Sequence, residues 1–206
     1  GEIYNYRELK SELIEKGATF KTTSDTEVIL KLYELEGTAS FKKLDGMFAF
    51  SIYDKNTNKL YIARDFFGEK PLYYTAMQNR FIWASELKSI VNLLDSKPEI
   101  SAKGLNLFLR LTYVPAPHTI YNGVYKLEAN HFMEYDFNTH RYTIKPINNE
   151  PEPNPQNISF DDAKKKVRQM VYDSVDSRSV SDVPLGTFLS GGVDSSIVSL
   201  CLSQAT

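Results

Sequence analysis

The sequence predicts an α+β domain followed by the first part of an α/β unit. Apolar residues first recur at helical spacing, and apolar and aromatic runs around short polar turns come next. A proline-rich stretch then precedes a Ser/Gly-rich turn. Because prolines disfavour both sheet and helix, we expect a first domain over residues 1–145, a linker over 146–158 and a truncated second domain over 159–206.

The helices of the first domain are predicted from spacing and from their end signals. Residues 6–16 have leucines at helical spacing, and Gly17 is a typical helix stop. Residues 24–27 have the Ser-x-x-Glu form of a capping box, so a second helix is expected to begin there. Ser101 is expected to cap a further helix that runs through Leu111.

The strands are predicted from runs of apolar, β-branched and aromatic residues. Residues 48–53 and 59–63 form one expected hairpin, and residues 72–75 and 80–83 form a second. A last hairpin is expected within 122–142. Because these runs are nearly continuous in apolar residues, the sheets are expected to be covered on both faces.

The expected second domain contains the most informative segment of the chain. A helix capped by Ser159 is followed by an expected strand at residues 183–189, which leads into SGGVDSS at residues 190–196. Paired glycines, serine hydroxyls and a helix N-terminus are suited to bind phosphate. The Asp194 carboxylate would be repelled by bound phosphates unless a divalent cation lay between them, so its presence in the loop indicates Mg²⁺. An ordinary tight turn capped by serine is the alternative, and no Lys follows the glycines as in a Walker A loop.

Composition excludes several classes of protein. The net charge is −2 with acidic and basic residues interspersed, so the protein has no electrostatic field that would attract nucleic acid. No apolar run approaches the roughly 20 residues needed to span a membrane. The single cysteine, Cys201, excludes a disulfide framework and fits a reducing compartment, so a cytoplasmic protein is expected. It lies at an apolar helical position, which favours a core role over a catalytic thiol. His118, His131 and His140 lack metal-ligand spacing.

Seven segments, in order, resemble the glutamine-hydrolysing asparagine synthetases over nearly the whole chain. The last of them resembles the SGGxDS pyrophosphate loop of the ATP pyrophosphatase superfamily, whose members split ATP between the α and β phosphates and leave AMP on the substrate. The segments are GEIYNYREL (1–9), SDTEVI (24–29), LDGMFAF (44–50), FGEKPLYY (67–74), ASELK (84–88), YVPAP (113–117) and DVPLGTFLSGGVDSS (182–196).

The resemblance implies a two-domain enzyme. The first domain would be a class II glutaminase with the N-terminal-nucleophile hydrolase fold, an αββα sandwich, here incomplete at its N-terminus. In this family an N-terminal cysteine releases ammonia from glutamine, and the ammonia displaces AMP from an aspartyl-adenylate made from ATP and aspartate with Mg²⁺. No cysteine precedes Gly1, so this chain by itself is expected not to hydrolyse glutamine.

The resemblance also implies roles for individual residues. Gly1 matches an N–H of the oxyanion hole, and Glu2 and Asp25 match the positions that hold the amino-acid end of glutamine. A solvated chain end and an acid favoured by the helix dipole are the structural alternatives for these two acids. The expected contacts of ATP and pyrophosphate are Leu189, Ser190, Gly191, Gly192, Asp194, Ser195 and Ser196, with Asp194 also the expected Mg²⁺ ligand.

Some positions depart from the family pattern, and two basic residues are expected to have structural rather than catalytic roles. Phe66 and His118 stand where arginine is usual, and Glu128-Ala129-Asn130 replaces a Pro/Gly-rich turn, which is expected to alter local packing. Arg64 and Lys70, basic residues among apolar strands, are expected to form a salt bridge or an interdomain contact rather than to act in catalysis.

Two other functions stay open at this point. One is an ATP-dependent amide-forming ligase or cyclase of the same architecture that does not use glutamine, although the retained Glu2 and Asp25 argue against it. The other is a non-catalytic binding module. The exposed halves of both domains favour self-association, so a homodimer is a further expectation.

Overall fold

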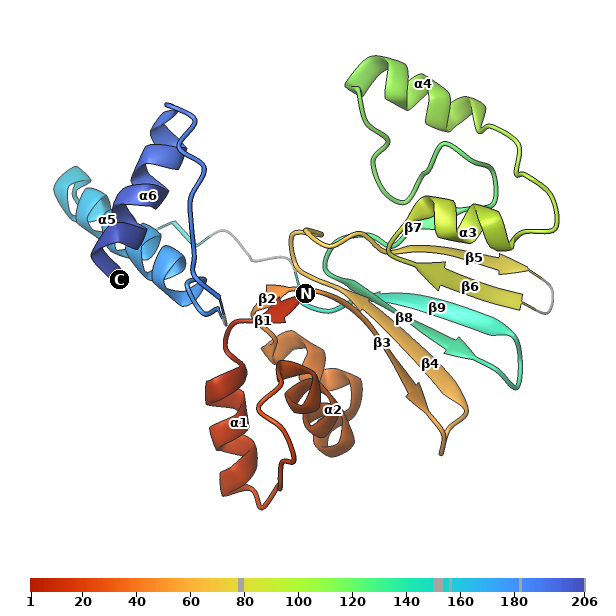
Figure 1. Cartoon of the computed structure of the whole chain (residues 1–206), viewed down its shortest axis with the longest axis horizontal. Helices are drawn as coiled ribbons and strands as arrows, with labels where there is room; N and C mark the ends of the chain where they lie inside the picture. The colour runs from red at the N-terminus through yellow and green to blue at the C-terminus, as the bar shows by residue number, and fades with distance from the viewer. Residues whose placement is uncertain (78–79, 150–153, 156, 182, 206) are drawn as a thin grey trace. The chain divides into compact units, whose positions relative to one another are not determined.

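The computed structural model describes residues 1–77, 80–149, 154–155, 157–181 and 183–205. The chain divides into two compact units, Gly1–Asn149 and Glu150–Thr206. Every strand found among the described residues belongs to the first unit (Figure 1). None of the described helices combines the length and the apolar character needed to cross a bilayer.

The strands of the first unit form three antiparallel sheets. Their orders are β1-β2, β3-β4-β8-β9 and β6-β5-β7. The bounds are β1 Glu2–Ile3, β2 Gly46–Met47, β3 Ala49–Asp54, β4 Lys59–Arg64, β5 Tyr73–Met77, β6 Arg80–Ala84, β7 Tyr125–Lys126, β8 His131–Asp136 and β9 Arg141–Pro146.

The helices begin close to the predicted capping residues. The Oγ of Ser24, Ser101 and Ser159 each accepts a hydrogen bond from a main-chain N–H in the first turn of its helix, as predicted for caps. The bounds are α1 Tyr6–Glu15, α2 Asp25–Glu36, the 3-10 helix η1 Gly37–Lys43, α3 Leu87–Leu93, α4 Ala102–Leu111, α5 Phe160–Ser177 and α6 Val193–Ala205.

The last predicted hairpin lies further along the chain than expected. Residues 131–136 and 141–146 form it as β8 and β9, whereas residues 122–142 were predicted. The prediction was wrong because β7 pairs with Tyr73 and Tyr74 of β5, which draws that segment into the other sheet.

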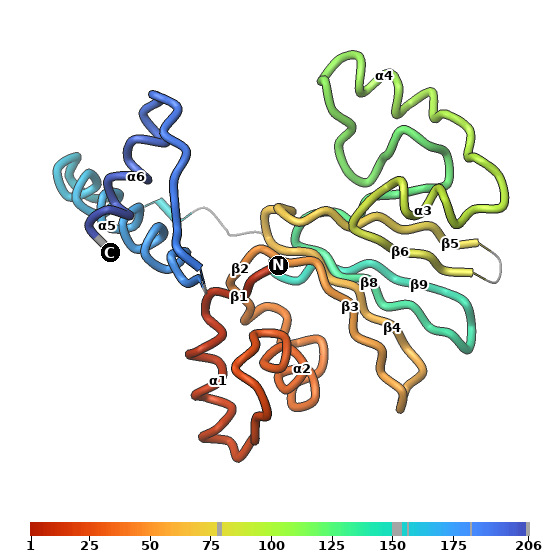
Figure 2. The backbone as a smooth tube through the Cα atoms, viewed as in Figure 1, coloured from red at the N-terminus to blue at the C-terminus, as the bar shows by residue number. Residues whose placement is uncertain are grey.

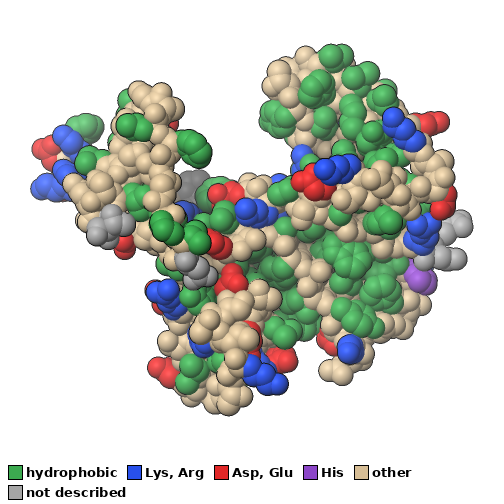
Figure 3. All heavy atoms as spheres, viewed as in Figure 1, with side chains coloured by type: hydrophobic (Ala, Val, Ile, Leu, Met, Phe, Trp, Pro, Cys, Tyr) green, Lys and Arg blue, Asp and Glu red, His purple; other side chains and the backbone are tan. Residues whose placement is uncertain are grey.

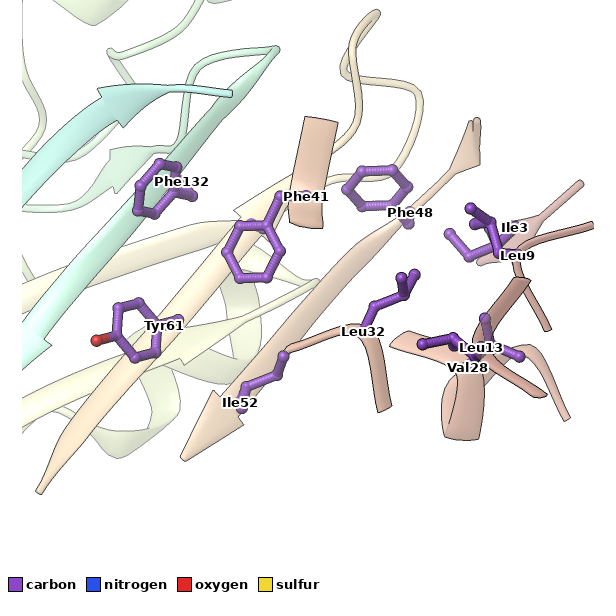
Figure 4. Packing of buried hydrophobic residues seen from close by; sticks show 11 residues of the cluster. Ile3, Leu9, Leu13, Val28, Leu32, Phe41, Phe48, Ile52, Tyr61 and Phe132 are labelled. Atoms are coloured by element: carbon purple, nitrogen blue, oxygen red, sulfur yellow. The ribbon is translucent and has the colours of Figure 1, made fainter. Parts of the chain in front are cut away.

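The first hydrophobic core lies between the helices α1, α2 and η1 and one face of the four-stranded sheet. Figure 4 shows Phe41 of η1 near the middle of this cluster, and its ring meets that of Phe132 edge to face at 5.5 Å between centroids. The buried members are Ile3, Leu9, Leu13, Val28, Leu32, Phe41, Phe48, Ile52, Tyr61, Ala63 and Phe132.

A second core lies on the opposite face of the same sheet. Along β4, Tyr61 and Ala63 belong to the first core while Leu60 and Ile62 belong to the second, the alternation expected of a strand covered on both faces. The ring of Tyr135 on β8 stacks on Phe81 of β6 at 4.5 Å, which joins the two larger sheets.

Helix α3 completes the layering of the first unit. It contacts β5 and β6, and its Ile90 is fully buried. Figure 1 shows α3 on the side of these strands away from the four-stranded sheet. The order is therefore helices, sheet, sheet, helix. This confirms the predicted α+β class and the αββα sandwich.

Helix α4 leaves much of its apolar surface exposed. Figure 3 shows hydrophobic side chains gathered over this helix. Leu105, Phe108 and Leu109 are all exposed, and Ser101 and Arg110 mark the polar ends of the element. The Ser101 cap correctly predicted the helix, but the sequence did not predict that its apolar residues would be exposed.

In the second unit, α5 and α6 contact each other (Figure 2). Helix α5 has no buried residue. Val167 and Met170 of α5 are exposed. Residues 183–189 form no strand, contrary to the prediction, and Phe188 is 98% exposed. A strand needs hydrogen-bonded neighbours, and all the described strands that could supply them belong to the first unit.

Candidate glutamine site and phosphate loop

The first candidate site begins at the short β1–β2 pair. Glu2 lies opposite Met47, and Ile3 lies opposite Gly46. A Cβ added to Gly46 would overlap the carbonyl oxygen of Glu2 and lie 2.9 Å from the Cα of Ile3, so only glycine lets the two backbones approach this closely. Gly1 and Glu2 are themselves exposed, which leaves both accessible to a ligand.

Asp25 is held against β1 by a direct hydrogen bond. It is the first residue of α2, directly after the Ser24 cap. The N–H of Ile3 donates to Asp25 Oδ2 at 3.0 Å, across 22 residues of sequence. Among the described residues, the contacts of Asp25 Oδ1 are long ones, 3.4 Å from the hydroxyls of Ser24 and Thr26. The Oδ2 atom of Asp25 therefore binds the main chain of β1, and the Oδ1 atom remains available to a cation.

The loop before α2 is stabilised by Glu27 rather than by a complete capping box. Glu27 accepts hydrogen bonds from the N–H groups of Lys21 and Thr22 and from the Thr22 hydroxyl. The pKa of Glu27 is lowered mainly by its hydrogen bond with the Thr22 hydroxyl and next by its hydrogen bond with the N–H of Lys21. Ser24 caps the helix through the N–H of Thr26. The sequence motif correctly placed the helix start, but it misassigned the partner of Glu27.

The fold thus brings together three predicted residues that are separated in sequence. Gly1 and Glu2 stand at one end of β1, and Asp25 is bonded to the residue that follows them. An N–H donor beside carboxylates is suited to a ligand that has a developing negative charge at one end and an ammonium group at the other.

Arg64 has a structural role, but of a different form from the expected salt bridge. Its guanidinium donates to the carbonyl oxygens of Lys70 at 2.7 Å, Leu127 at 2.6 Å and Gly68. Burial lowers the pKa of this group, and the neighbouring Asp65 carboxylate opposes that shift. Main-chain carbonyls, rather than a carboxylate, thus satisfy the buried cation.

The residue that follows Arg64 has a structural role that the sequence motifs did not predict. Asp65 is fully buried and accepts hydrogen bonds from the N–H groups of Phe48, Glu69 and Lys70. The available signal was an Arg-Asp pair directly after an apolar strand, because charges in such a place have to be paired or hydrogen-bonded.

The second candidate site is the turn before α6. Gly191 has φ +85°, a conformation that favours glycine. The hydroxyls of Ser190 and Ser195 lie 3.0 Å apart, and those of Ser195 and Ser196 also donate to the carbonyl of Gly192 at 3.1 and 2.8 Å. The turn therefore gathers three hydroxyls at a helix start, and it is largely exposed.

The remaining predicted residues of this loop lie beside the turn. Asp194 is in the first turn of α6, and Leu189 precedes the loop; both are exposed. In the part of the chain that the structure describes, no group of three or more His, Cys, Asp or Glu side chains is arranged to hold a metal ion. Cys201 lies on α6, half-buried and free.

The αββα layering of the first unit is that of the N-terminal-nucleophile hydrolase fold. Residues 1–145 match the family of glutamine amidotransferase domains, and the chain belongs to that family. Residues 166–206 match the asparagine synthase family. The two families follow each other along the chain, on either side of the proline-rich segment.

The chain is similar to curated asparagine synthetases. It is 42% identical over 205 residues to asparagine synthetase [glutamine-hydrolyzing] 1 of Bacillus subtilis, covering 96% of this chain and 31% of that protein. It is 39% identical over 203 residues to putative asparagine synthetase [glutamine-hydrolyzing] 2 of Methanocaldococcus jannaschii, covering 96% of this chain and 38% of that protein. The chain thus spans about a third of the length of these relatives.

The chain also resembles a solved structure, at low sequence identity. Glutamine phosphoribosylpyrophosphate amidotransferase from B. subtilis, complexed with ADP and GMP, matches with a TM-score of 0.49 and 17% identity. The match covers 99% of this chain and 42% of that one.

Proposed function

We propose that the chain is part of a glutamine-dependent asparagine synthetase. In this enzyme, glutamine hydrolysis in the first domain supplies ammonia to an aspartyl-AMP intermediate made from ATP and aspartate in the second. The observation that carries the proposal is the hydrogen bond from Ile3 to Asp25, which assembles the predicted glutamine site. The adjoining match to the asparagine synthase family supports the second half.

At the glutamine site, Gly1 supplies the main-chain N–H of the oxyanion hole. Such a donor stabilises the tetrahedral intermediate by about 3 kcal/mol. Glu2 and the Oδ1 atom of Asp25 bind the ammonium group of glutamine, which selects a free amino acid over a peptide. In this proposal Asp25 also holds β1 in place, so binding and site geometry depend on the same side chain.

At the loop before α6, the hydroxyls of Ser190, Ser195 and Ser196 and the helix N-terminus bind the phosphates of ATP. Leu189, Gly191 and Gly192 complete this surface. Asp194 would hold Mg²⁺, which neutralises phosphate charge when bound. The donor set fits this ligand, because hydroxyls and main-chain N–H groups suit phosphate and one carboxylate at the helix start suits a hard cation.

We further propose that the enzyme is cytoplasmic and homodimeric. The single cysteine fits a reducing compartment. The exposed apolar residues of α4 provide surface that a second subunit or another domain could cover.

The test is product formation by the full-length protein with Mg-ATP and aspartate. With either glutamine or ammonium as the nitrogen source, we expect asparagine, AMP and pyrophosphate in equal amounts, together with glutamate when glutamine is used. Turnover with ammonium but not with glutamine would favour the ligase or cyclase alternative. No pyrophosphate with either source would favour a non-catalytic module.

Asp25→Asn in the full-length protein tests the glutamine site. The amide keeps an oxygen for the Ile3 N–H but removes the negative charge, so the KM for glutamine should rise about 10- to 100-fold. Steady-state glutaminase kinetics measure this, and turnover with ammonium should not change. Glu8→Gln, which neutralises an exposed acid in the first turn of α1, is the matched control. An unchanged KM in the Asp25 variant would refute the assignment.

A further inference from the structure

Asp65 is a buried acid that the proposed function does not use. It follows β4 directly and its exposed fraction is 0%. Oδ1 accepts the N–H of Glu69 at 2.8 Å, and Oδ2 accepts those of Lys70 at 3.0 Å and Phe48 at 3.2 Å. Three main-chain donors therefore converge on one carboxylate, with the buried cation of Arg64 next to it in sequence.

The contact with Phe48 extends the pairing of β3 and β4 past the end of the ladder. The N–H of Asp65 donates to the carbonyl of Phe48 at 2.9 Å, while Asp65 Oδ2 accepts the N–H of Phe48. Both main-chain polar groups of Phe48 are thus bonded to Asp65. Phe48 is the residue between β2 and β3, so its main chain is fixed relative to the four-stranded sheet.

Phe48 in turn lies against the start of the candidate site. A Cβ added to Gly1 would lie only 2.9 Å from the Cα of Phe48, so the two main chains are in close contact. Glu2 pairs with Met47, the neighbour of Phe48. The position of the Gly1 end of β1 therefore depends on where the main chain of residues 47–48 is held.

The other end of β1 has separate supports. The N–H of Ile3 is bonded to Asp25, and the N–H of Tyr4 donates to the carbonyl of Asp45 at 2.8 Å. Loss of the Asp65 contacts would release the Gly1 end while the Ile3 end stays tied to α2. The two ends have different roles in the proposed chemistry. The Gly1 end contains the oxyanion N–H and Glu2, whereas the Ile3 end contains the contact with Asp25.

We propose that Asp65 is a positioning residue for the glutamine site, which fixes the Gly1 end of β1 through the main chain of Phe48. The inference rests on the proposed glutaminase function and adds a residue to it. A carboxylate is required because both oxygens must accept: an asparagine would turn its NH₂ toward main-chain donors on one side. The same carboxylate holds residues 69 and 70, so the loop over 66–70 is tied to the site as well.

The test is Asp65→Ala in the full-length protein, which removes both acceptor oxygens, with glutaminase kinetics measured beside ammonium-dependent turnover. A small misplacement of a reacting group can cost about 100-fold in rate, so we expect kcat for glutamine hydrolysis to fall about 10- to 100-fold. The KM for glutamine should rise by less than the 10- to 100-fold expected for the Asp25 variant, because the contact between Ile3 and Asp25 is kept while only the end that bears Gly1 and Glu2 is released. Ammonium-dependent turnover should be retained.

Thr75→Val is the matched control. It is a nearly isosteric change at a buried residue that removes one partly buried hydrogen bond, from the Thr75 hydroxyl to the carbonyl of Gly123, away from the site. Its kcat and KM should equal those of the wild type. If both variants lose activity to the same extent, or if kcat of the Asp65 variant is unchanged, the positioning role is overturned.

Amide hydrogen exchange of the wild-type chain tests the contact between Asp65 and Phe48 directly. It requires neither enzymatic activity nor a variant that folds. In the wild type, the N–H of Phe48 should be protected as strongly as that of Ile62 within β4, although Phe48 belongs to no strand. Exchange at the rate of an exposed loop would overturn the inference. Wild-type enzyme that hydrolyses no glutamine would overturn the proposed function, whereas an active wild type with an unaffected Asp65 variant would overturn only the role of Asp65.

Discussion

Asp25 and Gly46 show how single residues set the geometry of the candidate site. Asp25 follows the cap of α2 and reaches across to the N–H of Ile3. Gly46 has no side chain where β2 passes closest to β1. The sequence motifs predicted that Asp25 is functional, but they did not show that it also anchors the strand that carries Glu2. Gly46 stood in a matching motif without an assigned role.

Gly46→Ala tests the close approach of β1 and β2. The new Cβ would overlap the carbonyl oxygen of Glu2, so the strands must separate, and we expect the unfolding free energy to fall by about 1–3 kcal/mol. Urea unfolding of the first unit measures this. Gly186→Ala is the control, because a Cβ there meets no atom within 4 Å. Equal stability of the two variants would contradict the steric argument.

The elements were predicted best where a local signal and an apolar pattern agree. The helices capped by Ser24, Ser101 and Ser159 begin where predicted. The strand expected at 183–189 is missing and the last hairpin is shifted, because strand pairing depends on partners distant in sequence. Helix caps are local interactions, so a short motif carries most of the needed information.

The packing between the two larger sheets predicts a specific alkaline behaviour. Tyr74 of β5 is buried there, and burial raises the pKa of its hydroxyl, with smaller contributions from Tyr142 and Tyr125. The native state therefore keeps Tyr74 neutral above about pH 10, where an unfolded tyrosine ionises. Its stabilising contribution is complete below pH 10 and decreases by up to about 1.4 kcal/mol per pH unit above it.

Tyr74→Phe should remove this part of the pH dependence. Between about pH 10 and 11.5, the unfolding free energy of the variant should fall less steeply than that of the wild type, because phenylalanine has no proton to lose. Denaturant unfolding at several pH values measures the slope. Tyr53→Phe, at an exposed tyrosine, is the control. Parallel slopes for wild type and Tyr74→Phe would contradict the buried, neutral state of Tyr74.

For the whole molecule, the two units differ in how completely they are packed. Both buried hydrophobic clusters belong to the first unit, between its helices and sheets. In the second unit, α5 has no buried residue and the loop before α6 is exposed. The first unit therefore has the core of an independently stable domain, whereas the described part of the second has little to stabilise it by burial.

A chain ending at Asn149 should fold without the second unit. Because both clusters are retained, its unfolding free energy should lie within about 1 kcal/mol of that of the first-unit transition in the whole chain. Urea unfolding followed by near-UV circular dichroism, which reports on the aromatic core, measures this. A loss of more than about 3 kcal/mol would show that the second unit stabilises the first.

The sequence by itself determined the fold class and the helix starts. Through the family resemblance it also predicted the αββα sandwich and identified Gly1, Glu2, Asp25 and the loop over 190–196 as candidate site residues. These depend on short motifs and on periodic patterns that local chemistry explains. Only the tertiary structure decided that Asp25 holds β1, that Asp65 holds Phe48, and that residues 183–189 form no strand. Each of these depends on which distant main-chain donors and acceptors meet, and that is settled by packing rather than by neighbours in sequence.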